Sequence, residues 1–176
     1  MTPSLTDTLC TRCALCCDGS LFADVELASL KEASGLELLG LDVSHDDGEA
    51  RAGLLSLPCR ALEGRRCGIY AHRPACCRSF ECQLLKDAQS GAVSVEQALG
   101  HIADARSRIR RVKSLLAELG QRDERLPLAE RCAEALTRDG AATPAVRRRR
   151  VLLEHAMSGV TTLLRRRFLG RGRAEG

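Results

Sequence analysis

The cysteines are the residues of this chain whose type and spacing would suit a chemical role. The 176 residues include ten cysteines, and nine of them lie between Cys10 and Cys82. The first group reads C-x2-C-x2-C-C and consists of Cys10, Cys13, Cys16 and Cys17. A two-residue gap lets two thiolates of one turn bind the same ion, as in zinc knuckles and ferredoxin loops. The spacing therefore predicts metal ligation by this segment.

The second group of cysteines is spread over residues 59–82. Its predicted ligands are Cys59, Cys67, Cys77 and Cys82, and Cys76 is left over beside Cys77. Four thiolates fill one tetrahedral zinc site or hold one iron–sulfur cluster. Eight thiols therefore predict two such centres or one polynuclear site, and the spacing does not determine which ligands share an ion.

The start of the chain bears on whether these thiols stay reduced. The segment MTPSLTDTLCTRC has no basic stretch followed by an apolar run, so we expect no secretory signal and a cytoplasmic location. In that reducing compartment, dense cysteine indicates metal binding or redox chemistry rather than disulfides. Neighbours such as Cys16 and Cys17 also fit poorly into one disulfide but can face one metal ion. The alternative is the disulfide scaffold of an exported protein.

The order of the motifs resembles the YkgJ-type cysteine-cluster family, also called the CxxCxxCC family of zinc- or iron-chelating domains. The resemblance rests on three segments: Cys10-x2-Cys13-x2-Cys16-Cys17, Pro58-Cys59-x2-Leu62 and Cys67-Gly68-Ile69-Tyr70-x2-Arg73-Pro74-x2-Cys77-Arg78-x-Phe80-x-Cys82. It implies a metal-chelating module over residues 10–82. Two departures are Ala14, where the family often has glycine, and Cys76, an additional thiol inside a two-residue gap.

Two interpretations of the metal stay open. Zinc is slightly favoured, because a closed site of four thiolates suits it. The alternative is iron in an iron–sulfur enzyme or electron-transfer protein, either an oxidoreductase or methyltransferase-like, since the C-x2-C-x2-C run is also typical of ferredoxin loops. Some relatives in the family are flagellin lysine N-methylases, but the matched residues include no methyl-transfer site. The sequence indicates no substrate, no reaction and no nucleotide-binding loop.

Other residues between the cysteines have expected roles around the metal. Arginines could offset the charge of thiolate centres: Arg12, Arg60, Arg65, Arg66, Arg73 and Arg78. Ile69, Tyr70 and Phe80 are expected to pack as core beside the metal rather than to act directly.

The elements that must position the thiols follow from the composition. The aromatic residues are one tyrosine and three phenylalanines, so the core must be built from Leu, Ala and Val, which favours helices. We predict a mainly α protein, with a small irregular cysteine-rich metal lobe over residues 1–91 and an amphipathic helical segment over residues 92–176. Within the lobe, Asp24 is expected to cap a helix that ends before Gly35.

Residues 92–120 carry the clearest helical pattern, with Ser94 and Gln97 spaced as a capping box. The apolar positions recur at spacings of three, four or seven: Val95, Leu99, Ile102, Ile109, Val112, Leu116 and Leu119. Two further helices are expected from about residue 127 to a stop at Gly140, and from about residue 145 to 169. Cys132 falls on the first of these and is expected to be a small core residue.

The C-terminal segment is strongly basic. Residues 145–176 contain nine arginines and two glutamates. Such a segment could touch nucleic acid or an anionic surface, but the few aromatic residues offer no stacking platform for single strands. We favour a solvated helix end, with metal ions as the partners of the chain. No run of 18 or more apolar residues occurs, so no membrane span is expected.

Overall fold

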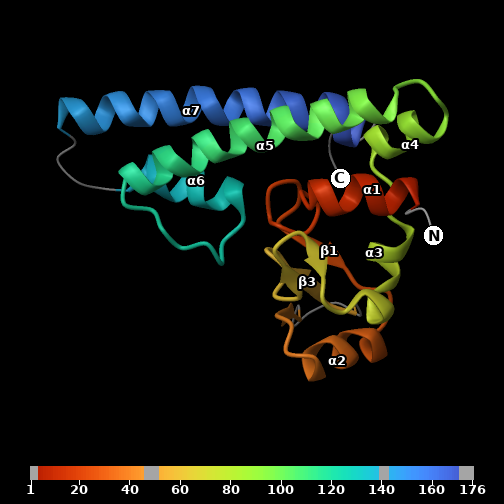
Figure 1. Ribbon diagram of the computed structural model, residues 1–176. Helices are drawn as coiled ribbons and strands as arrows, with labels where there is room; N and C mark the ends of the chain where they lie inside the picture. Colours follow the sequence, from red (N-terminus) through yellow and green to blue (C-terminus); the bar gives the residue numbers. More distant parts are fainter. Residues whose placement is uncertain (1–3, 46–51, 139–142, 171–176) are drawn as a thin grey trace. The chain divides into compact units, whose positions relative to one another are not determined.

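The computed structural model describes residues 4–45, 52–138 and 143–170 (Figure 1). The fold is mostly helical, with small sheets in the N-terminal half and long helices later, which confirms the predicted fold class. The predicted helix stop at Gly140 lies outside the described residues, as do Arg171 and Arg173 of the basic end. Within the described ranges, no helix is both long enough and apolar enough to span a membrane.

The chain divides into two compact units. The helical unit comprises Met1–Cys13, Glu81–Asp123 and Ala129–Gly176, and the cysteine unit comprises Ala14–Phe80 and Glu124–Leu128. The predicted domain boundary after residue 91 stays a prediction, because a compact unit need not be a domain that folds by itself.

Long helices build the helical unit. Helices α1 (Leu5–Cys13), α4 (Gln83–Gln89) and α5 (Val95–Glu118) pack together, and α5 lies beside α7 (Pro144–Leu164) (Figure 1). Helix α6 (Leu128–Thr137) precedes α7, and the π-helical turn η2 (Arg165–Leu169) continues it. An ion pair between Arg149 near the start of α7 and Glu118 at the end of α5, at 3.0 Å, shows that these two helices run antiparallel.

Local sequence signals explain where α5 begins and which side it buries. Ser94 Oγ accepts a hydrogen bond from the Gln97 N–H, and the Gln97 side chain accepts one from the Ser94 N–H, which confirms the predicted capping box. The buried side chains of α5 are Ala98, Ile102, Ala105, Ile109, Val112, Leu115 and Leu116. Val95, expected on that face, is exposed instead. Cys132 on α6 is 3% exposed, which confirms it as a core residue.

Short elements build the cysteine unit. They are β1 (Asp24–Glu26), α2 (Leu30–Leu38), β2 (Val43–Ser44), β3 (Leu54–Ser56), β4 (Leu62–Glu63), β5 (Arg66–Cys67), the 3-10 turn η1 (Tyr70–His72) and α3 (Ala75–Ser79). Strand β3 is the middle of a three-stranded antiparallel sheet in the order β1-β3-β2, and β4 and β5 form a separate hairpin. The hydrophobic cluster of this unit consists of Leu27, Ala33, Leu36, Leu41 and Leu55. Cys59 and Cys76 pack against that cluster.

The helix expected from Asp24 to a stop before Gly35 is wrong at both ends, because α2 begins at Leu30 and continues through Gly35 to Leu38. Asp24–Glu26 form β1, because Val25 pairs with Leu55 of β3. Helix α2 begins only at Leu30, after Ser29, whose Oγ accepts a hydrogen bond from the Glu32 N–H at 3.2 Å. Pairing with a distant strand therefore overrides the local capping signal.

Candidate metal centre

The pair Cys16 and Cys17 lies on a tight turn over residues 14–18. The N–H groups of Cys17 and Asp18 both donate to the Ala14 carbonyl oxygen at 3.0 Å. Ala14 has a φ of 60°, in the left-handed region that favours glycine. A glycine would adopt this conformation without the strain that a Cβ atom causes. The turn leaves the sulfur atoms of Cys16 and Cys17 only 3.8 Å apart.

The two groups of cysteines meet through the backbone of Cys17 and Cys59. The Cys59 N–H donates to the Cys17 carbonyl oxygen at 2.9 Å. The Cys59 carbonyl oxygen in turn accepts a hydrogen bond from the Leu62 N–H at 3.0 Å, which turns the chain into the β4–β5 hairpin. In that hairpin Cys67 pairs with Leu62, and its charge acts on Cys59. Segments that are far apart in the sequence thus bring Cys17, Cys59 and Cys67 into one neighbourhood.

Gly19 permits the backbone to approach the Pro58 ring closely, next to the hydrogen bond between Cys59 and Cys17. Gly19 has a φ of 72°, and a Cβ atom added to it would lie 3.0 Å from Cδ and Cγ of Pro58. We expect Gly19→Ala to destabilise the cysteine unit by about 2–3 kcal/mol, because it combines left-handed strain with crowding against a ring. Chemical denaturation of the full chain measures the change.

Gly64 offers a matched control for this substitution. It lies in the β4–β5 turn of the same unit with a φ of 63°, but nothing lies within 4 Å of its added Cβ. Gly64→Ala should therefore cost only the backbone strain, about 1 kcal/mol. Equal losses for the two variants would show that the approach of Pro58 to Gly19 is not tight in solution.

The second vicinal pair, Cys76 and Cys77, lies on α3. Their sulfur atoms are 4.0 Å apart. Pro74 precedes the helix with a φ of −62°, and the Ala75 N–H donates to Glu32 Oε1 of α2 at 2.7 Å. Pro74 therefore fixes the backbone direction from which the chain enters this pair. The sequence does not indicate that Glu32 contacts the start of α3, since the two are far apart along the chain.

The thiol pKa values reflect how closely these groups lie. The pKa of Cys77 is raised by its hydrogen bond with Cys76, by burial, and by the nearby charges of Cys76, Cys17 and Cys59. The same hydrogen bond lowers the pKa of Cys76 to about 7. Burial raises the pKa of Cys59, and the charge of Cys17 raises it further. A cation bound among these sulfurs would relieve their mutual repulsion.

The arginines near the thiols have different roles. The pKa of Cys17 is lowered by its hydrogen bond with Cys16, and the positive charge of Arg73 acts in the same direction. Arg73 thus offsets thiolate charge as expected. Arg60 instead pairs with Asp42 on the surface at 2.7 Å.

The three residues expected to pack as core beside the metal differ in their surroundings. Ile69 packs against the hydrophobic cluster. The Phe80 ring meets the Phe22 ring edge-on, with ring centres 5.3 Å apart. The expectation is wrong for Tyr70, which is 53% exposed. Its ring supports the Arg73 guanidinium, whose Cζ lies 3.7 Å from the ring centre.

Three of the predicted ligands belong to the helical unit. Cys10 and Cys13 lie on α1, where the Cys13 carbonyl oxygen accepts a hydrogen bond from Arg106 Nη1 at 2.8 Å. Cys82 precedes α4, and burial raises its pKa. The eight predicted ligands are therefore distributed over both units, and their ligation of metal stays a prediction.

The described thiols suit a thiophilic metal in kind and in pairwise spacing. In a tetrahedral zinc site with Zn–S bonds of about 2.3 Å, neighbouring sulfurs lie about 3.8 Å apart. Both vicinal pairs are close to this separation, and no disulfide joins any of the ten described cysteines. In the described part of the chain, no three His, Cys, Asp or Glu side chains are already arranged to hold one ion. Metal binding would therefore require the thiol side chains to rotate toward a common point.

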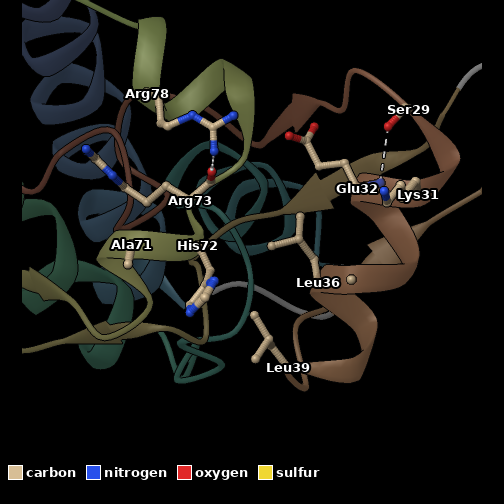
Figure 2. A pocket seen from close by; sticks show the side chains of 10 residues that line it. Ser29, Lys31, Glu32, Leu36, Leu39, Ala71, His72, Arg73 and Arg78 are labelled. Atoms are coloured by element: carbon tan, nitrogen blue, oxygen red, sulfur yellow. Dashed lines mark hydrogen bonds between the residues drawn. The ribbon is translucent and has the colours of Figure 1, made fainter.

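A groove lies between α2 and the segment 71–78 of the cysteine unit (Figure 2). It has a volume of about 410 Å³, and its lining includes Lys31, His72, Arg73 and Arg78. The Arg78 guanidinium donates to the Arg73 carbonyl oxygen at 2.5 Å. The described residues that line the groove include no cysteine, but they include Arg73 and Glu32, whose charges act on Cys17 and Cys76. The sequence could not indicate it, because its two walls are distant in the chain.

Cysteines from separate segments of the chain meet on a small, mostly irregular unit, a pattern typical of cysteine-rich metal-binding domains. The sequence profile of the CxxCxxCC family, described as a "putative zinc- or iron-chelating domain", matches residues 9–99. Since the match covers more than half of the chain, the protein belongs to this family. No curated protein and no solved structure matches the chain.

Proposed function

We propose that the chain is a zinc-binding protein whose cysteine unit holds the metal through thiolates. The hydrogen bond between the Cys59 N–H and the Cys17 carbonyl oxygen carries this proposal, because it joins the two groups of cysteines. These thiols lie close enough to affect one another, since the charges of Cys17 and Cys67 raise the pKa of Cys59 and the charge of Cys59 raises the pKa of Cys77. These four are proposed as one centre. Cys10, Cys13, Cys16 and Cys82 remain proposed ligands that are not assigned to a particular metal ion.

The chemistry of such a centre favours a structural or storage role. A zinc ion closed by four thiolates keeps no open position for a substrate. Among the described residues, the hydrophobic cluster of the cysteine unit has five buried members, with other side chains packed partly buried against it. Metal bound to so small a core would add free energy of folding. A cytoplasmic location, where thiols stay reduced, is part of the proposal.

Metal analysis tests the proposal directly. We expect protein purified anaerobically without chelator to contain at least one zinc ion per chain and to be colourless, because zinc has a filled d shell. Elemental analysis, thiol titration and an absorption spectrum of the same sample provide the measurement. Less than one metal ion per chain, with all thiols titratable, would reject metal binding.

The same sample distinguishes the iron interpretation. Brown protein that contains iron and inorganic sulfide would show that the centre is an iron–sulfur cluster rather than a zinc site. That result would favour an electron-transfer protein or an iron–sulfur enzyme. Stoichiometric zinc in colourless protein would exclude that alternative under these conditions.

A further inference from the structure

The groove of Figure 2 carries positive charge that the described part of the chain does not offset. Its lining includes three basic residues: Lys31, Arg73 and Arg78. No described carboxylate forms an ion pair with any of them. The lining carboxylate of Glu32 is already satisfied, because its two oxygens accept hydrogen bonds from the Ala28 N–H at 2.9 Å and the Ala75 N–H at 2.7 Å. The groove therefore suits an anionic ligand.

The two arginines of the groove are held in place before any ligand arrives. The Arg73 Nε donates to the Tyr70 carbonyl oxygen at 3.3 Å, and its guanidinium lies over the Tyr70 ring, 3.7 Å from the ring centre. The Arg78 Nη1 donates to the Arg73 carbonyl oxygen at 2.5 Å. Each of these hydrogen bonds uses one guanidinium nitrogen, so the other nitrogens can donate to a carboxylate. Side chains fixed in this way lose less entropy when a ligand binds.

Apolar side chains of α2 lie beside the charged wall. Leu36 and Leu39 project from α2 toward segment 71–78 (Figure 2). Leu39 is 48% exposed, Leu38 next to it is 90% exposed, and Leu30 at the start of the helix is 65% exposed. A small anion inside the groove would leave Leu30 and Leu38 in water, whereas a polypeptide lying along α2 would cover them. Exposed apolar side chains next to a charged groove are typical of protein-binding surfaces.

We propose that this groove docks an acidic polypeptide segment of a partner protein. Carboxylates of the segment pair with Arg73 and Arg78, and its apolar side chains pack against the exposed leucines of α2. The groove volume of about 410 Å³ falls in the range of about 300–1,000 Å³ that is usual for ligand sites. The docking does not depend on bound metal, since the described residues that line the groove include no cysteine.

Gly35 provides a substitution that fills the groove and spares the fold. It lines the groove from α2, and nothing lies within 4 Å of a Cβ atom added to it. Leucine is also a better helix former than glycine, so Gly35→Leu should fold. We expect the reduced full chain to bind a fluorescein-labelled peptide of alternating aspartate and leucine saturably, as measured by fluorescence anisotropy. Gly35→Leu should weaken this binding at least about tenfold.

Gly100 on α5 gives the matched control. An added Cβ atom there also meets nothing within 4 Å, and Gly100 belongs to the helical unit. Gly100→Leu should therefore leave the affinity for the peptide unchanged. Equal losses in the two glycine variants would overturn the groove as the binding site.

A second pair of variants tests the charge without filling the groove. Arg78→Gln should weaken binding of the aspartate–leucine peptide by roughly tenfold, because it removes one carboxylate partner. Arg60→Gln should leave binding unchanged, since Arg60 pairs with Asp42 and does not line the groove. An unchanged affinity in Arg78→Gln would overturn the pairing of carboxylates with the groove arginines.

Two further peptides decide whether the docking is specific. A peptide of alternating lysine and leucine should not bind, and a peptide of alternating aspartate and serine should bind at least about tenfold more weakly. Equal binding of either peptide, or no saturable binding of the aspartate–leucine peptide to the parent chain, would overturn the proposal. None of these results bears on zinc content, so the proposed function is tested separately.

Discussion

Replacement of Cys59 by serine is expected to cause the largest loss of metal affinity among the single cysteine variants. The charges of Cys17 and Cys67 act on Cys59, and the charge of Cys59 acts on Cys77. Cys59 has no adjacent cysteine in the sequence that could take its place. Cys17 and Cys77 each have a second thiol within 4.0 Å. We expect Cys59→Ser to weaken zinc binding at least about a hundredfold, or about 2.8 kcal/mol, in competition with a chromophoric chelator.

Two comparisons make this prediction specific. Cys77→Ser should lose less affinity than Cys59→Ser, because Cys76 is available to substitute. Cys132→Ser should retain full zinc content, since its thiol is buried in the helical unit and burial raises its pKa to about 11. Equal zinc loss in Cys59→Ser and Cys132→Ser would show that the variants lose metal by general unfolding rather than by loss of a ligand.

The parts of the fold that the sequence predicts are those governed by contacts close in the chain. Helix α5 is the clearest case, because its cap needs only Ser94 and Gln97 and its apolar face repeats with the helical period. The error at Asp24 has the opposite origin. Strand β1 exists because Val25 pairs with Leu55. No local sequence pattern predicts a pairing partner 30 residues away along the chain.

The candidate site shows the same division. The cysteine spacing predicts which thiols are available, but not that the Cys17 carbonyl oxygen accepts a hydrogen bond from the Cys59 N–H. The left-handed φ of Ala14 also cannot be predicted from the sequence, because alanine rarely adopts that conformation. Glu32 beside α3 and the groove in Figure 2 depend on how α2 packs, which only the tertiary structure reveals.

Removal of metal is expected to unfold the cysteine unit while the long helices persist. The hydrophobic cluster of the unit is small, and its strands contain only two or three residues each. Structural zinc contributes about 10–16 kcal/mol to the folding of zinc-finger peptides, so even a fraction of that would dominate here. We expect amide exchange in β3 (Leu54–Ser56) to accelerate at least about a hundredfold after chelation under reducing conditions.

The long helices provide the internal control in the same sample. Helix α5 has seven buried side chains and packs against α7, so the amide exchange of its central residues, such as Ile109 and Val112, should stay unchanged. Readdition of zinc should restore protection in β3, which separates metal loss from oxidation of the thiols. If β3 keeps its protection without metal, the cluster around Leu36 and Leu55 holds the unit by itself. Zinc would then be a cargo bound to a preformed fold, whereas collapse of the unit would mean that its release is coupled to unfolding.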